Sequence, residues 1–484
     1  MNKMKLGLVV LLICVPFWGR SLTASVKDNT QPNIIHILAD DVGYDDLSCF
    51  GSRDISTPNL DALAGKGMKF TSFYAPHGTC TPSRAALLTG RYAPRVNDGA
   101  GLYVLFPHST HGLEDEQEVT ITELLKEEGY TTGLFGKWHL GHLPQYLPCV
   151  HGFDEFLGIP YPNDHGPERI GNSGWRSSGI SDPAIPLIKQ AQVIKRCDNN
   201  DLAELPALFT REACKFIYRA VKEKKKPFYL QYANIETHTP WFVPKGFEGR
   251  SKAGAYGDAV EYLDVSVGII LNTLKRLGIE NNTIVVFSSD NGPLIHRDKE
   301  LENCYGKFGF TDPERKHILR EGKYQERFEG GIRVSCIMAW PGVIPPGTTC
   351  DKPVTSMDLF STFANLSGAD LPNDRVIDGK NILPLMLGDE NAKSPHKAIY
   401  GFKARGGLMS VRFNNWKLIL PGKHWTGDFE SPRLYDLSEE VGETHNLADQ
   451  YPEVVEEIIK MAVKAEESIE EKESINQINL FEKN

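Results

Sequence analysis

The stretch Asn33-Ile-Ile-His-Ile-Leu-Ala39 is mainly apolar and runs directly into Asp40-Asp41. A short apolar run of this kind is typical of a strand that is buried on both faces of a parallel sheet. Far along the chain, Thr283-Ile-Val-Val-Phe-Ser-Ser289 runs into Asp290-Asn291 in the same way. Ligands of open α/β sheets bind just beyond the carboxyl ends of strands. The two strand ends therefore predict a shared site.

The side chains at these two strand ends offer oxygen atoms. They are Asp40, Asp41, Asp290 and Asn291. Oxygen ligands suit Ca²⁺ or Mg²⁺ and do not suit zinc. For either pair alone, capping of the following turn or helix is a competing interpretation. Taken together, the two pairs favour a hard-cation site.

Apolar strand-like runs alternate with helical patterns over most of the chain. The pattern predicts strands over 33–39, 131–135, 227–233 and 283–288, and helices over 58–67, 119–129, 210–224 and 259–277. This rhythm indicates an α/β sandwich with a large, mostly parallel sheet. After about Leu387, short strands and one long charged helix follow. We therefore expect a larger domain over residues 30–390 and a smaller α+β domain with an antiparallel sheet over 391–484.

The N-terminus has the pattern of a secretory signal peptide over residues 1–24. Lys3 and Lys5 precede the apolar run Leu6–Phe17, and small residues end at Ala24. The apolar run is short for a membrane span, and no stable span is expected elsewhere. We expect an exported protein, periplasmic or extracellular, or lysosomal in a eukaryotic host. The net charge of −10 argues against a nucleic-acid partner.

A dense motif lies at Cys80-Thr-Pro-Ser-Arg84-Ala-Ala-Leu-Leu-Thr-Gly-Arg91. A helix is expected after Pro82, so Cys80 would lie just ahead of a helix N-terminus, where backbone N–H groups favour anionic character. A lone cysteine there would otherwise be a buried or mildly activated thiol. The run resembles, without a gap, the signature C-x-P-S-R-x-x-x-L-T-G-R of formylglycine-dependent sulfatases. The resemblance extends from about Asn33 to Ala448 and is greatest to the arylsulfatase A and N-acetylgalactosamine-6-sulfatase branch. It implies an alkaline-phosphatase-like fold.

Three further motifs follow in the order of that family. Gly136-Lys-Trp-His-Leu-Gly supplies Lys137 and His139, Glu236-Thr-His-Thr-Pro-Trp supplies His238, and Gly322-Lys-Tyr-Gln supplies Lys323. The resemblance implies a catalytic set of Cys80, Arg84, Lys137, His139, His238 and Lys323. It also implies that Asp40, Asp41, Asp290, Asn291 and residue 80 hold one Ca²⁺ per chain.

The resemblance implies a specific chemistry at residue 80. A formylglycine-generating enzyme would oxidise Cys80 to formylglycine (3-oxoalanine), whose hydrate attacks sulfur and forms a covalent sulfoenzyme. Arg84 and Lys137 would orient the hydrate. Lys323 and His238 would contact the sulfate, and either would protonate the leaving alcohol. His139 would take a proton from the second hydroxyl and so release sulfate.

The segment Gly158-Ile-Pro-Tyr-Pro-Asn-Asp-His-Gly-Pro167 resembles the substrate-pocket loop of the same branch. Pro162 and Asn163 stand where arylsulfatase A has a serine and a histidine, so substrate identity does not carry over. We expect Asn163, Asp164 and His165 to bind substrate; a loop-stabilising role is the competing interpretation.

Three functions are compatible with these motifs. The favoured one is a sulfatase that acts on sulfated carbohydrates, with galactose- or N-acetylgalactosamine-type units expected by analogy. The second is a phosphonate or phosphate ester hydrolase of the same superfamily, which would use the same kind of metal site and nucleophile. A catalytically silent glycan-binding protein is disfavoured because every catalytic position is filled.

Overall fold

The computed structural model describes residues 31–165, 184–295, 317–423 and 428–481, with side chains up to residue 469. The predicted signal peptide, residues 1–24, lies outside the described residues. Within the described residues, no helix is both long enough and apolar enough to cross a membrane.

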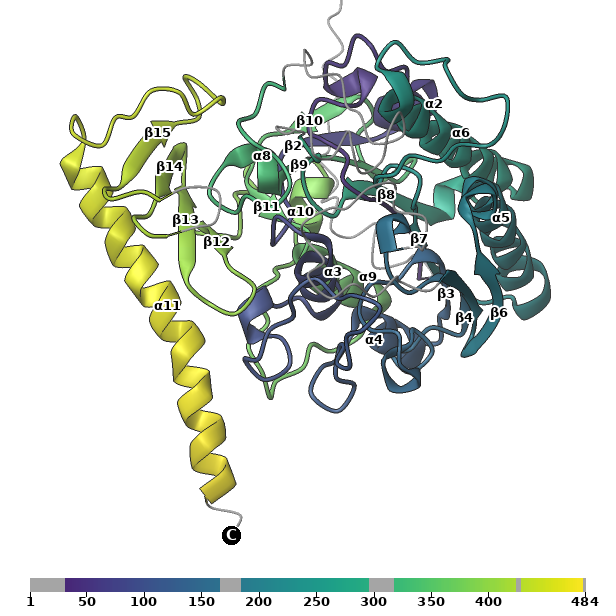
Figure 1. Cartoon of the computed structure of the whole chain (residues 1–484), viewed down its shortest axis with the longest axis horizontal. Coiled ribbons are helices and arrows are strands. Elements are labelled where there is room, and N and C mark those ends of the chain that lie inside the picture. The colour runs from purple at the N-terminus through teal and green to yellow at the C-terminus, as the bar shows by residue number, and fades with distance from the viewer. Residues whose placement is uncertain (1–30, 166–183, 296–316, 424–427, 482–484) are drawn as a thin grey trace, which may run out of the picture. The chain divides into compact units, whose positions relative to one another are not determined.

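A large mixed sheet forms the centre of the described chain (Figure 1). From one edge to the other its strands are β10 (Thr348–Cys350), β2 (Met68–Tyr74), β9 (Arg333–Ala339), β8 (Thr283–Ser289), β1 (Asn33–Ala39), β7 (Phe228–Ala233), β3 (Thr131–Lys137), β4 (Glu155–Ile159), β5 (Ile185–Lys189) and β6 (Gln192–Cys197), with β11 (Val354–Thr355) beside β2. The central strands β8, β1, β7, β3 and β4 are mutually parallel, whereas β9 runs antiparallel to both of its neighbours. The predicted mostly parallel α/β sheet is confirmed.

The two faces of the sheet are covered by two separate apolar layers. Along β1, Ile35 and Ile37 pack into the layer that includes helices α2 (Pro58–Lys66), α5 (Asn199–Tyr218) and α6 (Gly254–Leu277). Ile34 and Leu38 pack into the opposite layer, with α3 (Cys80–Thr89), α4 (Ile121–Glu127) and α9 (Asp358–Ser367). Successive strand residues point to opposite faces, so burial on both faces explains why this strand is apolar throughout.

Shorter helices complete the described chain. They are α8 (Glu329–Ile332), α10 (Leu383–Met386), the π-helical turn η5 (Arg219–Lys224) and the 3₁₀ turns η1 (Ser48–Phe50), η2 (Ala93–Arg95), η3 (Pro144–Tyr146), η4 (Asn163–His165) and η6 (Glu280–Asn282). The predicted helix over 210–224 begins earlier, at Asn199. Asp198 caps it reciprocally with Asp201, and Pro206 lies inside it. An internal proline predicts a break, and the capping box and the packed apolar face outweigh that preference.

A second, antiparallel sheet follows near the C-terminus. Its strands are β12 (Ile399–Phe402), β13 (Leu408–Phe413), β14 (Trp416–Ile419) and β15 (Arg433–Asp436), and helix α11 (Pro452–Phe481) packs against it (Figure 1). Its apolar core also takes in Ala86 and Tyr92 from the N-terminal part of the chain. The smaller antiparallel sheet is confirmed, and the domain boundary near residue 390 stays a prediction.

A buried charged cluster joins the two sheets. Glu329, at the start of α8, accepts hydrogen bonds from the Tyr74 hydroxyl at 2.6 Å and from Lys417 Nζ of β14 at 2.9 Å. Glu329 N donates to Glu443 Oε2 at 2.8 Å. Glu329 and Glu443 are fully buried, and Lys417 is 1% exposed. This cluster links β14 of the smaller sheet to β2 of the large sheet.

Among the described residues, Cys49, Cys80, Cys149, Cys197, Cys214, Cys336 and Cys350 are all free thiols. Cys304 lies outside the described residues. No disulfide therefore links any two of the described cysteines.

Candidate active site

The ends of β1 and β8 bring the four predicted oxygen-bearing side chains together. The two strands pair in parallel with Ala39 opposite Ser289, which places Asp40 beside Asp290. Asp41 N donates to Asp290 Oδ1 at 3.3 Å, and Asn291 Nδ2 donates to Asp41 Oδ1 at 2.7 Å. All four side chains are buried.

Residue 80 lies against this carboxylate cluster. The Cys80 thiol is 3.4 Å from Asp40 Oδ1 and 3.9 Å from Asp41 Oδ1. Helix α3 begins at Cys80, with Thr79 as its extended N-cap residue, rather than after Pro82 as the sequence predicts. Pro82 is tolerated in the first turn because its missing N–H has no intrahelical partner there. Burial raises the pKa of the Cys80 thiol well above its usual value, so the unmodified thiol is protonated.

Two cationic side chains hold the carboxylates in place. Lys137, the last residue of β3, donates from Nζ to Asp40 Oδ2 at 2.6 Å. Arg84 on α3 donates from Nε to Asp290 Oδ2 at 2.8 Å and from Nη1 to Lys137 O at 2.8 Å. Burial alone would raise the pKa of Asp40, but Lys137 and the other nearby cations hold it well below its usual range. Asp40 is therefore ionised despite its complete burial.

The carboxylate cluster has the features of a cation site. Asn291 Oδ1 is buried and has no hydrogen-bond partner among the described residues. Burial and the charge of Asp40 raise the pKa of Asp290 to about 6, and a cation between the two carboxylates would offset that repulsion. Ligand atoms of Asp40, Asp41, Cys80 and His238 lie within 4.8 Å of one another. The oxygen atoms that Asp40, Asp41, Asp290 and Asn291 offer at this point fit a hard divalent cation.

Lys323 and His238 face the same cluster from two further loops. Lys323 Nζ donates to Asp41 Oδ2 at 2.6 Å and lies 3.0 Å from His238 Nε2. His238 Nδ1 lies 2.6 Å from Thr239 O. A carbonyl accepts and an ammonium group donates, so these partners assign the proton to Nδ1 and leave Nε2 as the acceptor. Burial and Lys323 lower the pKa of His238, and the proton between the two side chains therefore belongs to Lys323.

His139 shows the opposite tautomer. Its Nε2 lies 3.0 Å from Leu105 O and must carry the hydrogen, because the carbonyl oxygen can only accept. Nδ1 is buried and has no hydrogen-bond partner among the described residues. Burial and Lys137 lower the pKa of His139 well below its usual value. An unprotonated, unpartnered nitrogen is the form that can accept a proton.

The predicted substrate loop lies next to His238. Asn163 donates from Nδ2 to Ile235 O at 2.8 Å and to His238 O at 3.2 Å. Its amide nitrogen therefore helps to hold the His238 loop, whereas Asn163 Oδ1 is buried and has no hydrogen-bond partner among the described residues. Burial raises the pKa of Tyr324, the neighbour of Lys323, and the charge of Asp164 contributes to that rise. His165 Nε2 lies 3.7 Å from Asp164 Oδ1. The three side chains border the site, and their contact with substrate stays a prediction.

Thr81 is a site residue that sequence reasoning missed. Its hydroxyl donates to His139 O at 3.0 Å and accepts from Leu105 N at 3.2 Å. The hydroxyl thus joins the start of α3 to the segments that carry His139 and Leu105. No feature of the sequence reveals this link, because the three segments meet only in the folded chain.

Comparison with known proteins identifies the family. The family model for sulfatases matches residues 32–369, and the model for the C-terminal region of N-sulphoglucosamine sulphohydrolase matches residues 321–471. The chain belongs to the sulfatase family. This sulfatase is 38% identical over 468 residues to arylsulfatase A of Bos taurus, covering 91% of this chain and 88% of the relative. It is 38% identical over 419 residues to N-acetylgalactosamine-6-sulfatase of Canis lupus familiaris, covering 83% and 74%.

A solved structure agrees with the fold. The structure of Ps i-CgsB in complex with k-i-k-neocarrahexaose is 29% identical to this sulfatase, with a TM-score of 0.73, and the match covers 90% of this chain and 93% of that one. Family and fold together establish this sulfatase as a sulfuric ester hydrolase that acts on a sulfated substrate. Formylglycine and a divalent metal are general features of the family.

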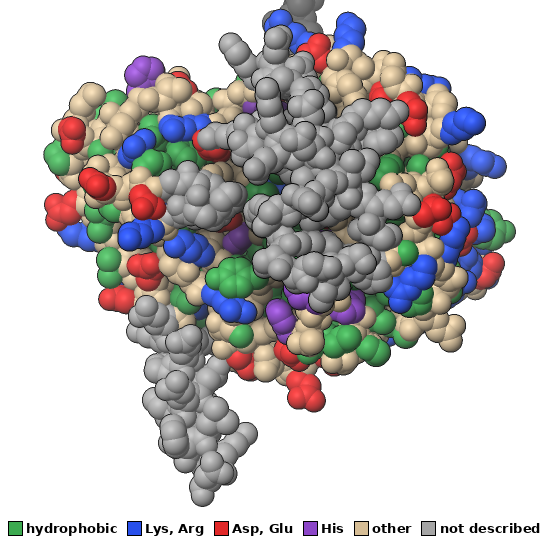
Figure 2. All heavy atoms as spheres, viewed as in Figure 1, with side chains coloured by type: hydrophobic (Ala, Val, Ile, Leu, Met, Phe, Trp, Pro, Cys, Tyr) green, Lys and Arg blue, Asp and Glu red, His purple; other side chains and the backbone are tan. Residues whose placement is uncertain are grey.

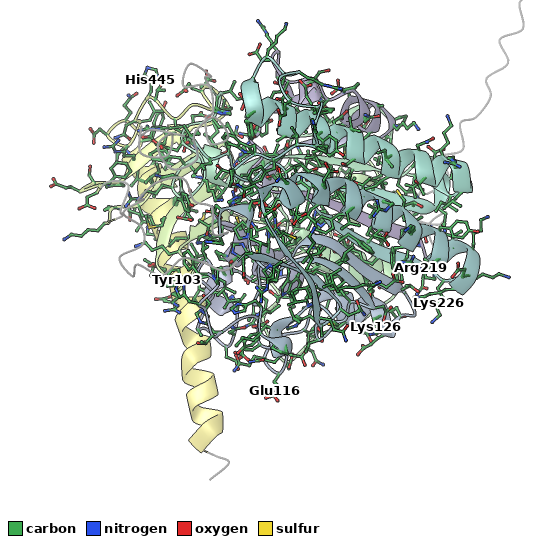
Figure 3. All side chains as sticks on the ribbon, turned by 45° about the vertical axis from the view of Figure 1, so that its right-hand side comes forward. Tyr103, Glu116, Lys126, Arg219, Lys226 and His445 are labelled. Atoms are coloured by element: carbon green, nitrogen blue, oxygen red, sulfur yellow. The ribbon has the colours of Figure 1, made fainter. Side chains whose placement is uncertain are left out.

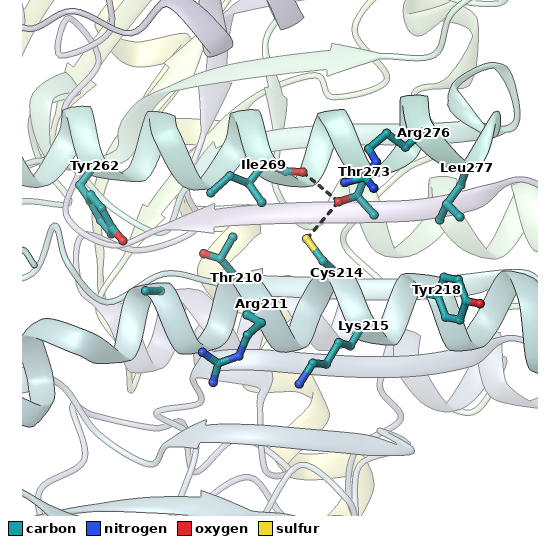
Figure 4. A pocket seen from close by; sticks show the side chains of 11 residues that line it. Thr210, Arg211, Cys214, Lys215, Tyr218, Tyr262, Ile269, Thr273, Arg276 and Leu277 are labelled. Atoms are coloured by element: carbon teal, nitrogen blue, oxygen red, sulfur yellow. Dashed lines mark hydrogen bonds between the residues drawn. The ribbon is translucent and has the colours of Figure 1, made fainter.

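A pocket of about 570 Å³ lies between helices α5 and α6 of this sulfatase, apart from the predicted catalytic residues (Figure 4). Thr210, Cys214 and Tyr218 line it from α5, and Tyr262 and Thr273 line it from α6; the Thr273 hydroxyl donates to Cys214 Sγ at 3.2 Å. None of the predicted catalytic or metal-binding residues lines this pocket.

Proposed function

We propose that this sulfatase removes sulfate from sulfated carbohydrates, with galactose or N-acetylgalactosamine units as the favoured substrates. The proposal includes a formylglycine formed from Cys80 as the nucleophile that takes up the sulfuryl group, and one Ca²⁺ per chain. The observation that carries it is the burial of residue 80 among Asp40, Asp41 and their cationic partners. The names of the N-acetylgalactosamine-6-sulfatase relative and of the neocarrahexaose complex support the carbohydrate assignment.

The charges of the site suit an anionic ester. Three carboxylates, Asp40, Asp41 and Asp290, are matched by three cationic side chains, Arg84, Lys137 and Lys323. Asp40, Asp41, Asp290, Asn291 and residue 80 would hold the cation, which would lower the pKa of the attacking hydroxyl and supply further positive charge. The loaded site is therefore net positive, whereas the whole chain carries −10.

The remaining side chains bind the ester and move protons. Lys323 is charged and donates toward the sulfate and the leaving oxygen, where negative charge develops. His238 accepts from Lys323 and holds its ammonium group in place. His139 accepts a proton at Nδ1 from the second hydroxyl of residue 80, while the bond from the residue 80 carbon to the sulfate oxygen breaks; sulfate leaves and the aldehyde is regenerated. Arg84 and Lys137 fix the carboxylates that position residue 80.

Maturation and location belong to the same proposal. A formylglycine-generating enzyme would act on the Cys80 segment before folding, because α3 and residue 80 are fully enclosed in the folded chain. The signal-peptide pattern at the N-terminus supports export to the periplasm or the exterior, or to lysosomes in a eukaryotic host.

The sulfate and phosphate esters of one phenol test the reaction class. Wild-type protein should cleave the sulfate ester with the higher kcat/KM, and Cys80→Ala should abolish turnover while circular dichroism stays unchanged. A large preference for the phosphate ester would instead indicate a phosphonate or phosphate ester hydrolase. Turnover that survives in Cys80→Ala would remove residue 80 from the mechanism.

A further inference from the structure

The C-terminal parts of helices α5 and α6 carry an excess of positive charge. Residues 211–226 include seven Lys and Arg against two Glu, and Lys275 and Arg276 lie in the last turn of α6. We call the Lys and Arg side chains of residues 211–226 and 275–276 the basic patch. Lys and Arg side chains gather on the right-hand side of the face in Figure 2, where Figure 1 shows α5 and α6, with acidic side chains between them. A chain with a net charge of −10 therefore has a surface that is locally positive.

Ion pairs leave part of this positive charge unmatched. Glu212 pairs with its helix neighbours Arg211 and Lys215, and Glu155 at the start of β4 pairs with Arg219. Within the part of the chain that the structure describes, no carboxylate pairs with the exposed side chains of Lys222, Lys225, Lys226, Lys275 and Arg276. These cations are free to bind anionic groups from outside the chain.

The pocket between α5 and α6 is a groove that runs into the basic patch. Arg211 and Lys215 line it from α5, and Arg276 lines it from α6. Along α5 the lining extends from Ala207 to Tyr218, a length of about 16 Å at 1.5 Å per residue. The groove therefore places cationic side chains along a line, on both of its walls.

Two tyrosine rings lie at opposite ends of this groove. Tyr262 lies beside Thr210 at one end, and Tyr218 lies beside Leu277 at the other (Figure 4). Tyr218 is 51% exposed, and Tyr262 is half-buried. An aromatic ring offers a flat apolar surface to the apolar face of a sugar, whereas Lys and Arg donate to carboxylates and sulfates. The groove combines both kinds of contact, and a solvated helix end would offer charge alone.

The basic patch is remote from the catalytic residues. Helix α5 leads through η5 into β7, and α6 leads through η6 into β8. Lys222 and Arg276, near the ends of these helices, therefore lie toward the amino ends of the two strands. Asp290 lies beyond the carboxyl end of β8, which has seven residues and a length of about 23 Å. A ligand of the basic patch does not occupy the catalytic site.

We propose that the basic patch and the groove between α5 and α6 form a second binding site for an acidic glycan chain, which holds a polymeric substrate on the protein while another part of the same chain reaches the catalytic residues. The inference rests on the carbohydrate sulfatase function proposed above and extends it to a polymer. A chain of sulfated or uronic acid sugars repeats its negative charge along its length, which complements cations set along a groove. Attachment at a second site raises the concentration of the cleavable ester near the catalytic residues.

Binding of a labelled polymer tests the second site directly. The polymer alternates a uronic acid with sulfated N-acetylgalactosamine, and the protein is the full chain with Cys80→Ala, so that the polymer stays intact. Lys222→Gln combined with Arg276→Gln should raise Kd about tenfold, as expected for the loss of two exposed ion pairs. Lys393→Gln combined with Lys397→Gln removes two exposed lysines outside the basic patch and should leave Kd unchanged. Equal Kd values in the two double variants would overturn the inference.

Tyr218→Leu separates a glycan from an acidic protein as the partner. It keeps an apolar side chain but removes the ring, and should raise Kd for the glycan polymer by about fivefold. Kd for polyglutamate of the same length should not change. Equal Kd values for the two polymers, both insensitive to Tyr218→Leu, would indicate a site for acidic proteins and would overturn the glycan assignment.

Kinetics with an otherwise wild-type chain test the role of the second site in catalysis. A disaccharide of the same repeat is too short to reach both sites, so the polymer should have a KM at least tenfold lower. Lys222→Gln with Arg276→Gln should remove most of that difference and leave kcat and KM for the disaccharide unchanged. A polymer that is cleaved no better than the disaccharide would overturn the inference and leave the proposed function intact. Cleavage of 4-nitrophenyl sulfate but of no sugar sulfate would overturn the proposed substrate class as well.

Discussion

Replacing Lys323 by glutamine should reduce the cleavage of sugar sulfates far more than the cleavage of aryl sulfates. Lys323 Nζ lies 2.6 Å from Asp41 Oδ2 and 3.0 Å from His238 Nε2, and it holds the proton shared with His238. At an effective dielectric constant of about 20, a positive charge about 4 Å from the developing oxyanion contributes about 4 kcal/mol. That energy corresponds to a rate factor of roughly a thousand. A sugar alkoxide needs this stabilisation in full, whereas nitrophenolate needs little.

Steady-state kcat with a sulfated monosaccharide and with 4-nitrophenyl sulfate measures the difference. The sugar sulfate should lose roughly a thousandfold, and the nitrophenyl ester at least tenfold less. His238→Gln should show the smaller dependence on the leaving group, because His238 acts by accepting from Lys323. Lys126→Gln, on the surface, is the matched control for loss of a lysine (Figure 3). Equal losses on both substrates in Lys323→Gln, or a larger leaving-group dependence in His238→Gln, would refute the proton assignment.

Three further predictions concern the metal, the link between the sheets, and pH. Asp290→Ala, or exhaustive chelation, should abolish turnover and lower Tm, because a ligand at a hundred times its Kd stabilises the folded state by about 2.7 kcal/mol. Glu116→Ala, which removes an exposed acid, should change neither turnover nor Tm. Full activity after chelation would exclude a metal role. Glu329→Gln leaves Lys417 buried without its carboxylate partner, and should reduce the free energy of unfolding in urea by about 3–5 kcal/mol. Glu280→Gln, which breaks an exposed ion pair, should reduce it by less than about 1 kcal/mol. Similar losses in the two variants would show that the buried cluster does not stabilise the link between the sheets. Burial raises the pKa of Glu329, but Lys417, Arg412 and Arg333 lower it, and the result is a pKa of about 2 instead of 4.5. The stabilisation by the ionised carboxylate is therefore complete above pH 4.5 and is lost as pH falls toward 2. Glu329→Gln should flatten this acid part of a plot of Tm against pH, and an unchanged acid part would mean that other groups cause the loss of stability.

The sequence predicts the central sheet well because both of its faces are buried. In β1 and β8 the burial leaves a continuous apolar signal, and the strand ends then place Asp40 beside Asp290 through the pairing register. Helices with a clear apolar face are recovered within a few residues, as in α6, which begins at Gly254 rather than Ala259. The start of α5 was missed because Pro206 suggests a break that the capping of Asp198 and the packed face overcome.

The proton positions in the site could not be predicted from the sequence. They depend on which backbone carbonyl each histidine faces, Leu105 O for His139 and Thr239 O for His238, and the first of these lies far along the chain from its histidine. The sequence leaves open whether Lys323 or His238 donates to the leaving group, and the folded contacts favour Lys323. For Asn163, the amide nitrogen donates to Ile235 O and His238 O, and the contact of this side chain with substrate stays a prediction.

The mass of the peptide that contains residue 80, taken from a preparation whose turnover number is known, tests the central claim most directly. We expect residue 80 to be formylglycine in a fraction of chains that rises in proportion to activity across preparations. A fully active preparation in which residue 80 is intact cysteine would contradict the account.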